Sequence, residues 1–395
     1  MGQRGYERTH PWISFKPDFR GASPALWVLL GEAASKIEHI AGTPLKPSVA
    51  QDLHQLFLAK GAMATTAIEG NTLSEEQVRL AVEGLLELPK SQAYLKQEVA
   101  NIIEECNRLL PLMDEGSLTD LTYERLLEMN AQVLKGLSLA PEVVPGQIRT
   151  HSVGVGRYRG APHEDCEFLL RRLCEWLPTV PRSMGEDPDW KVPLAIFQAV
   201  LAHLYLAWIH PFGDGNGRTA RLVEFELLIQ AGVPSPAAHL LSNHYNHTRA
   251  EYYRQLDQAS QSGGDVIPFV MYAVQGFVDG LREQIKTIRS FQMTLAWNDY
   301  VHSAFQDAPS KTAVRRQLLV QAMGPEWIKL DELLENSGRL AQHFNGKTPK
   351  TLTRDINALV EMDLVEKSGT KVRARFEIIE AFLPRRSGKR GARNR

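Results

Sequence analysis

Apolar residues recur three and four positions apart along most of the first 290 residues, which is the period of an α-helix with one buried face. The pattern is clearest in four segments that each end near Gly or Pro: 25–42, 47–70, 74–88 and 96–113. Gly and Pro are the residues that most often end helices. We therefore expect residues 1–113 to form a helical N-terminal region.

The helical pattern stops in residues 147–160, where β-branched residues are mixed with Gly and basic residues in "IRTHSVGVGRYRG". This mixture predicts a short β-hairpin. Helical spacing resumes at 164–177, and the segment 192–209 is apolar on nearly all sides, which favours a helix buried at the centre of a domain. We expect a mainly α domain over residues 114–290, built around that helix.

A third pattern begins after about residue 290. Three amphipathic segments, at 310–323, 328–338 and 348–369, precede an alternating segment at 371–379. Three helices followed by a hairpin are typical of a winged helix-turn-helix domain, which we place at residues 291–383. The last residues, 384–395, contain six basic residues and no apolar anchor, so we expect a disordered basic tail.

Composition and charge narrow the classes of protein. The 395 residues are 43% hydrophobic and 23% charged, with a net charge of −1, so no global basic field draws the chain to nucleic acid or anionic lipid. The three cysteines are an odd number without C-x-x-C spacing, which suits a reducing cytosol. The N-terminus does not resemble a signal peptide, and we expect no membrane span, no membrane partner and a cytoplasmic location.

The segment "HPFGDGNGRTAR", residues 210–221, carries the candidate chemistry. The glycines let the backbone turn so that successive N–H groups converge before a helix begins, which makes an anion hole. Arg218 and Arg221 lie three apart on one face of that helix, where both could clamp phosphate oxygens. Asp214 is the single carboxylate beside this cradle, which suits a Mg²⁺ ion that also binds phosphate and water.

His210 lies four residues before that carboxylate and has a side chain suited to removing a proton from a hydroxyl group. The combination indicates transfer of a phosphorus-containing group to an alcohol. Each part also has an ordinary structural explanation: a His that caps a helix, a Gly-rich turn, or an Arg221 that pairs with nearby Glu224. The whole order of residues makes chance a poor explanation.

The same segment resembles the signature of the Fic family, H-x-F-x-[DE]-G-N-G-R-x-x-R, at every defined position, and the wider resemblance covers about residues 20 to 285. It implies a Fic-type helical core with a β-hairpin flap and a protein adenylyltransferase that moves AMP from ATP to a Ser, Thr or Tyr hydroxyl. It also implies a role for each residue: His210 as base, Phe212 as a core anchor, Asp214 as Mg²⁺ ligand, Gly215, Asn216 and Gly217 as anion hole, and Arg218 and Arg221 on the phosphate tail.

A second resemblance lies in "TTAIEGN", residues 65–71, which fits the inhibitory-helix pattern [ST]-x-x-x-E-[GN] through Thr65, Glu69 and Gly70. The resemblance implies an inhibitory helix at about residues 50–70. A carboxylate at Glu69 that pairs with Arg221 would neutralise the residue needed for the γ-phosphate, so ATP could not settle in its productive pose. The alternative is a surface helix that ends in Glu-Gly.

The resemblance extends to the target and the adenine base. The hairpin at 147–160 corresponds to the flap, which holds a target protein by strand addition. The segment "RAEYYRQL" resembles the family's adenine pocket, which makes Tyr252 and Tyr253 candidates for stacking, although core tyrosines would look the same. An Asn found nearby in some relatives is Ser260 here, which puts the contacts to the base in doubt.

Other readings stay open. Family members that phosphorylate their targets typically carry Lys at the position of Gly217, which argues against that reaction, but transfer of another phosphate-containing group and removal of AMP are both compatible with the motif. A different class is a nucleotide-sensing regulator that binds DNA through the winged helix with Thr351, Thr353, Arg354 and Asn357. The acidic residues Asp355, Glu361, Asp363 and Glu366 weaken that hypothesis. A homodimer is a further expectation, because relatives often dimerise.

Overall fold

The computed structural model describes residues 4–117, 120–182, 190–306, 310–335 and 338–380. The basic tail expected at 384–395 lies outside the described residues. The chain divides into two compact units, which we call unit 1 (Met1–Ile285) and unit 2 (Lys286–Arg395). The long helix α14 (Ile267–Ala304) begins in unit 1 and ends in unit 2.

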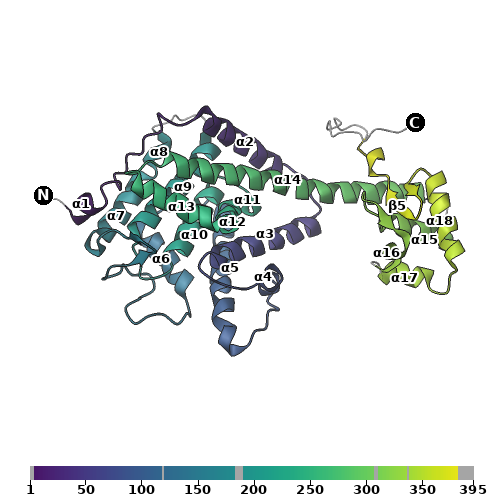
Figure 1. The fold of residues 1–395 in the computed structure, drawn as a ribbon, viewed down its shortest axis with the longest axis horizontal. Helices are drawn as coiled ribbons and strands as arrows, with labels where there is room; N and C mark the ends of the chain where they lie inside the picture. The colour runs from purple at the N-terminus through teal and green to yellow at the C-terminus, as the bar shows by residue number, and fades with distance from the viewer. Residues whose placement is uncertain (1–3, 118–119, 183–189, 307–309, 336–337, 381–395) are drawn as a thin grey trace. The chain divides into compact units, whose positions relative to one another are not determined.

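Unit 1 is almost entirely helical, as the periodicity predicted (Figure 1). The only strands among its described residues are the antiparallel pair β1 (Gly154–Val155) and β2 (Tyr158–Arg159), which form the predicted hairpin. The helices before α14 are α1 (Gly5–Thr9), α2 (Pro24–Ala41), α3 (Pro47–Ala67), α4 (Glu75–Val82), α5 (Ala93–Asp114), α6 (Tyr123–Leu134), α7 (His163–Trp176), α8 (Thr179–Arg182), α9 (Lys191–Ile209), α10 (Asn216–Gln230), α11 (Ser235–Ala238), α12 (Leu240–His247) and α13 (Arg249–Gln261), with a 3₁₀ turn at Lys90–Gln92.

Helices α9 and α10 pack against each other at the centre of unit 1. Helices α2 and α7 cover α9, while α3, α5 and α6 cover α10. Among the described residues, helix α9 is long and apolar enough, by length and composition, to cross a membrane. Because 83% of its apolar window is buried inside the protein, its sequence reflects its place as the central core helix.

Helix α3 contains the predicted inhibitory segment and packs against α4, α5, α10, α11 and α12. A close approach at Gly61 seats the helix: a Cβ atom at this position would overlap the imidazole ring of His239. That ring is buried and stacks on Phe225 of α10, with ring centroids 4.5 Å apart. Gly61 therefore lets α3 lie directly against the core helix α10, which follows the loop of segment 210–221.

Unit 2 begins with the C-terminal part of α14 and continues with α15 (Lys311–Gln321), β3 (Ile328–Lys329), α16 (Leu330–Glu335), α17 (Gly338–Phe344), α18 (Pro349–Glu361), β4 (Val365–Ser368) and β5 (Lys371–Ala374). The three strands form an antiparallel sheet in the order β3-β5-β4. Trp297, Leu319, Ile356, Leu359 and Val372 are among the residues of its apolar core.

The helices and the final hairpin follow the expected order, but several details of the expectation are wrong. The segment 348–369 is helical only to Glu361, and Val365–Ser368 form β4. Residues 338–344 form a separate helix, α17, and β5 ends at Ala374 instead of reaching residue 379. The chain turns into a 3₁₀ helix at Phe376–Ile378 because Phe376 stacks on Trp297, with centroids 4.8 Å apart. The assignment as a winged helix stays a prediction.

Candidate active site

The candidate site lies where α9 meets α10. Helix α9 ends at Ile209, and His210 follows in a left-handed conformation (φ 50°, ψ 59°) with its N–H donating to the Leu206 carbonyl. This conformation is uncommon for a residue other than Gly, and it turns the chain sharply at the candidate base. Phe212 is 1% exposed and pairs with Ile148, which anchors the loop in the core.

Asn216 closes this loop with its side chain. Its Oδ1 accepts from the Phe212 N–H at 2.9 Å, and its Nδ2 donates to the Phe212 carbonyl at 2.8 Å. The side chain is therefore committed to the loop, and only the backbone N–H of Asn216 remains to serve in an anion hole. The first N–H groups of any α-helix lack an intrahelical acceptor, and α10 begins at Asn216.

Two glycines are required around this helix start. Gly215 has φ 76° and lies against Asn130, whose Nδ2 would be 3.0 Å from a Cβ at this position. Asn130 also donates to the Asp214 carbonyl and accepts from the Gly146 N–H, so it ties the loop to α6. A Cβ at Gly217 would overlap Glu69 Oε1. The helix start is therefore open only because no side chain fills it.

The His210 imidazole is suited to act as a base. Burial lowers the pKa of His210 to about 4, so the ring is neutral at pH 7. Nδ1 lies 3.4 Å from the Ala207 carbonyl, which favours the tautomer with the proton on Nδ1 and leaves Nε2 free to accept a proton. This assignment of the tautomer is inferred from the hydrogen bond.

Arg149 holds the backbone around His210 and was not predicted. Its Nε donates to the His210 carbonyl at 2.7 Å, its Nη1 donates to the His151 carbonyl at 2.6 Å, and its Nη2 donates to the Ala161 carbonyl. Arg149 is 4% exposed, so these bonds satisfy a buried guanidinium. They connect the candidate base to both ends of the segment that contains the hairpin.

Arg218 is held by two carboxylates. Nη1 donates to Glu98 Oε1 of α5, and Nη2 donates to Asp214 Oδ1, each at 3.1 Å. Glu98 also accepts from Asn71 Nδ2 at 2.8 Å. Sequence reasoning missed Glu98, since nothing in its local sequence marks it and its partner lies 120 residues away.

Asp214 is the only one of the predicted site residues that suits a metal ion. No group of three or more His, Cys, Asp or Glu side chains that could hold an ion occurs among the described residues. The Asp214 side chain is 48% exposed and accepts from Arg218 and from the Gly215 N–H. A single half-exposed carboxylate beside an anion-binding helix start fits Mg²⁺, which takes most of its ligands from phosphate and water.

Arg221 is the most deeply buried charge of the site, with 2% of its surface exposed. Its Nη2 donates to Glu69 Oε1 at 2.6 Å and to the Thr65 carbonyl at 2.9 Å. Its Nε and Nη1 have no partner among the described residues. A buried guanidinium with unsatisfied donors is an anion site that one carboxylate only partly fills.

Glu224 forms no hydrogen bond or ion pair with Arg221 among the described residues, so the alternative of a direct pair between them is wrong. Glu224 Oε1 accepts from the Tyr245 hydroxyl at 2.8 Å, and Oε2 lies 3.1 Å from His203 Nδ1. The acid bonds to this buried network, whereas Arg221 donates to Glu69 and to the Thr65 carbonyl, and the charge of Glu224 reaches Arg221 only without a direct bond.

Glu69 lies in the turn that follows α3, two residues after the helix ends at Ala67. The turn closes with the Glu69 N–H donating to Thr66 and with Gly70 at φ 103°, a conformation that favours glycine. Burial alone would raise the pKa of Glu69, but the charge and hydrogen bond of Arg221 outweigh it, so that pKa lies below its usual range. The structure thus joins the two predicted residues as an ion pair.

The two tyrosines of α13 differ. Tyr252 is 3% exposed, its hydroxyl lies 2.8 Å from His203 Nε2, and its ring stacks on Tyr245. Tyr253 is half-buried, and its hydroxyl donates to the Ile68 carbonyl at the end of α3 at 3.4 Å. Tyr252 is thus a core residue, and only Tyr253 has surface available for a ligand. Ser260 is buried and bonds the Asp257 carbonyl.

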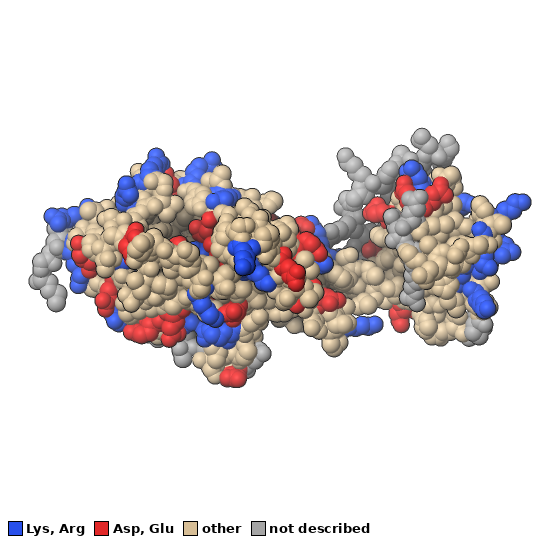
Figure 2. All heavy atoms as spheres, turned by 90° about the horizontal axis from the view of Figure 1, so that it is seen from below, with Lys and Arg blue, Asp and Glu red and all other residues tan. Residues whose placement is uncertain are grey.

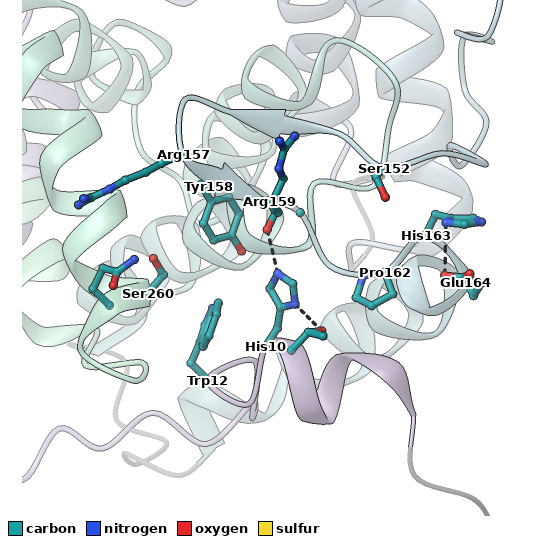
Figure 3. Close-up of a pocket in the computed structure, with 13 residues that line it drawn as sticks. His10, Trp12, Ser152, Arg157, Tyr158, Arg159, Pro162, His163, Glu164 and Ser260 are labelled. Carbon is teal, nitrogen blue, oxygen red and sulfur yellow. Dashed lines mark hydrogen bonds and ion pairs between the residues drawn. The ribbon is translucent and has the colours of Figure 1, made fainter.

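The hairpin lies against the candidate base, since a Cβ at Gly160 would be 2.8 Å from the His210 Cβ. Its register, Val155 opposite Tyr158, leaves the backbone groups of Gly154 and Arg159 pointing outward from the pair. His10 Nε2 lies 2.8 Å from the Arg159 carbonyl, so the N-terminal segment occupies the outer edge of β2 (Figure 3). These two segments border a cavity of about 540 Å³.

Comparisons with known proteins show which family this chain resembles. Residues 120–228 match the model of the Fic/DOC family. The chain is 35% identical over 216 residues to protein adenylyltransferase fic-1 of Caenorhabditis elegans and 29% identical over 211 residues to protein adenylyltransferase Fic of Nematostella vectensis. These matches cover 53% of this chain but only 38% and 45% of the two relatives, so the chain matches less than half of either protein.

Solved structures share the fold. A Fic family protein from Desulfovibrio desulfuricans G20 matches 91% of this chain and 98% of its own, with a TM-score of 0.56 and 23% identity. Fic-1 from C. elegans matches 72% of this chain and 76% of its own, with a TM-score of 0.51 and 25% identity. Residues 120–228 thus match a Fic domain, and the similarity of the chain to the Fic/DOC family rests on this segment.

Proposed function

We propose that the protein transfers AMP from ATP to a hydroxyl group of a target protein. The observation that carries the proposal is one juxtaposition: a neutral, partly buried His210 beside the open start of α10 and the half-satisfied guanidinium of Arg221. The matched relatives are protein adenylyltransferases by name, which supports the same activity here.

In the proposed reaction, Nε2 of His210 takes the proton of the target hydroxyl as its oxygen attacks the α-phosphorus of ATP. An oxygen–phosphorus bond forms, the bond from the α-phosphorus to the bridging oxygen of the β-phosphate breaks, and pyrophosphate leaves. His210 then releases its proton to solvent. The N–H groups of Asn216 and Gly217 would bind phosphate oxygens as charge moves onto the leaving group.

Asp214 would hold the metal. Mg²⁺ at this carboxylate would supply charge neutralisation between the phosphates. Arg218 and Arg221 would hold the phosphate tail, but both are paired with carboxylates in this structure. Productive binding of ATP therefore requires that at least the Arg221 pair opens.

We propose that Glu69 is an inhibitor built into the chain. Its carboxylate occupies Nη2 of Arg221 and lies where a side chain at Gly217 would be. The γ-phosphate and Glu69 compete for one guanidinium, so the enzyme is inactive while the pair is closed. In a variant of the same reaction, a water held by Glu69 would attack AMP on a modified target and remove it.

We propose that the target adds a strand to the outer edge of β1 at Gly154. Both strands would be candidates from the sequence, but His10 already takes the outward carbonyl of β2. Gly154 and Val155 are exposed. A target strand on β1 would extend the hairpin that lies against His210. The homodimer and the cytoplasmic location stay predictions.

The decisive experiment incubates wild type, Glu69→Gly and Glu69→Gly/His210→Ala with Mg²⁺ and ATP labelled at the α- or the γ-phosphate. Strong α-label on protein for Glu69→Gly alone, with no γ-label, supports AMP transfer, the base and the inhibitor together. Loss of His210 should reduce labelling by about 10²-fold or more. Label from the γ-phosphate would identify phosphorylation instead, and equal labelling of the double variant would refute the role of His210.

A further inference from the structure

Unit 2 presents a face on which positive side chains outnumber exposed acids. Lys350, Thr353, Arg354 and Asn357 of α18 recur at the spacing of one helix face, and all four are exposed. We define these residues and Lys367 as the basic face. Figure 2 shows Lys and Arg gathered at one edge of unit 2, the edge that α18 forms in Figure 1.

Two of the acids that make residues 348–369 nearly neutral by sequence are paired with arginines inside unit 2. Asp355 is fully buried and accepts from Arg315 Nε at 2.7 Å and Arg316 Nε at 2.9 Å. Asp363 pairs with Arg375. These acids neutralise arginines elsewhere in the unit, so they do not offset the charge of the basic face.

The strand hairpin adds to the same face. Lys367 lies opposite Val372 in the β4-β5 ladder, and Val372 is buried. Lys367 therefore points to the sheet side that meets α18, where its Nζ donates to Asn357 Oδ1 at 3.2 Å. Glu366 and Arg373 pair with each other on the opposite side of the sheet.

No ion pair engages Lys350, Arg354 or Lys367 among the described residues of this unit. Glu361, one turn beyond Asn357, is the one exposed acid on this face of α18. The uncompensated charge thus occupies the N-terminal half of the helix and the adjoining strand. An exposed helix with basic, Thr and Asn side chains next to a basic hairpin suits a nucleic-acid duplex.

We infer that the basic face binds duplex DNA, with Lys350 and Lys367 on phosphates and the N-terminal half of α18 in the major groove. Arg354, which has no acid partner, is placed to reach a base edge there. This binding is a second activity of the chain, and it does not depend on the AMP transfer proposed for unit 1.

The test is fluorescence anisotropy of a labelled 30-bp duplex with the full-length protein between about 50 and 200 mM salt. Each phosphate contact adds about 0.9 to the slope of log affinity against log salt. Lys350→Ala/Arg354→Ala should weaken binding by about tenfold and lower the slope by about 1 to 2.

The matched control is Lys329→Ala/Arg373→Ala, which removes two positive charges from the same unit that are already paired with Glu332 and Glu366. Its effect should be clearly smaller, and thermal unfolding checks that both variants fold. Unchanged binding by Lys350→Ala/Arg354→Ala would overturn the inference and assign binding to the basic tail, which both variants keep. Competition by polyglutamate as strong as by duplex DNA would also overturn it, in favour of an acidic protein partner.

Discussion

The Glu69–Arg221 pair of unit 1 and the Asp355–Arg315–Arg316 cluster of unit 2 use the same chemistry in opposite ways. Asp355 is fully buried, and each of its oxygens accepts from a different arginine. Glu69 is 34% exposed on its side chain and leaves two donors of Arg221 unpaired. A carboxylate with all its bonds made and no solvent access is structural, whereas one with open partners and a route to water can be displaced by another anion.

The largest effect should come from removing the structural carboxylate. Asp355→Ala leaves Arg315 and Arg316 beside each other without their acid, and breaking a buried pair in this way costs about 3–5 kcal/mol. Urea unfolding of the full chain should show unit 2 melting early. Glu69→Ala is the comparison: the Glu69 side chain is 34% exposed, so water can reach the donor that it leaves, and the loss of unfolding free energy should be clearly smaller than for Asp355→Ala. Equal losses of unfolding free energy in the two variants would contradict the distinction between a structural and a displaceable carboxylate.

Gly61→Ala should weaken the Glu69–Arg221 ion pair although neither residue of the pair is changed. The new methyl group overlaps the His239 ring, so α3 must shift, at a cost of about 1–3 kcal/mol. Because α3 leads into Glu69, the basal rate of α-label transfer should rise above wild type. Gly31→Ala on α2, where a Cβ meets nothing within 4 Å, is the control and should leave the rate unchanged. If Gly61→Ala lowers stability but does not raise the rate of α-label transfer, then the packing of α3 on His239 does not control the Glu69–Arg221 pair.

The smallest effect concerns pH. Since burial lowers the pKa of His210 to about 4, the base stays neutral down to about pH 5, and the transfer rate of Glu69→Gly should change less than about twofold between pH 8 and 6. An ordinary histidine would lose most of its activity over that range. The same shift means that unfolded protein binds this proton more readily, so the contribution of His210 to stability is present above about pH 6.5 and is lost toward pH 4. A rate that halves near pH 6.5 would contradict the burial of the base.

The sequence predicted the parts of the site that are continuous in the chain. Residues 210–221 form one loop and one helix start, so their order alone indicates an anion hole, a base and two arginines. The partner of Arg221 was found only through the family resemblance, because Glu69 lies 152 residues away. Glu98, Asn130 and Arg149 were missed for a related reason: each is a single polar residue whose role comes from a distant backbone or charge.

Errors in the fold also arise from tertiary contacts. The apolar alternation of residues 371–379 predicts a strand, but Phe376 packs on Trp297 and ends it. The four acids near α18 suggested a weakly charged segment, yet Asp355, Asp363 and Glu366 pair with arginines from other parts of unit 2 or the facing strand. Composition counts charges, and only the folded chain shows which of them remain available.

The missing side chain at Gly217 has a consequence for how this protein can evolve. Any larger residue there would strike the Glu69 carboxylate and also fill the space at the start of α10. Under the proposed function, this one position therefore affects two traits, inhibition by Glu69 and the shape of the nucleotide site. A larger side chain here would change the proposed nucleotide site and displace the Glu69 carboxylate together.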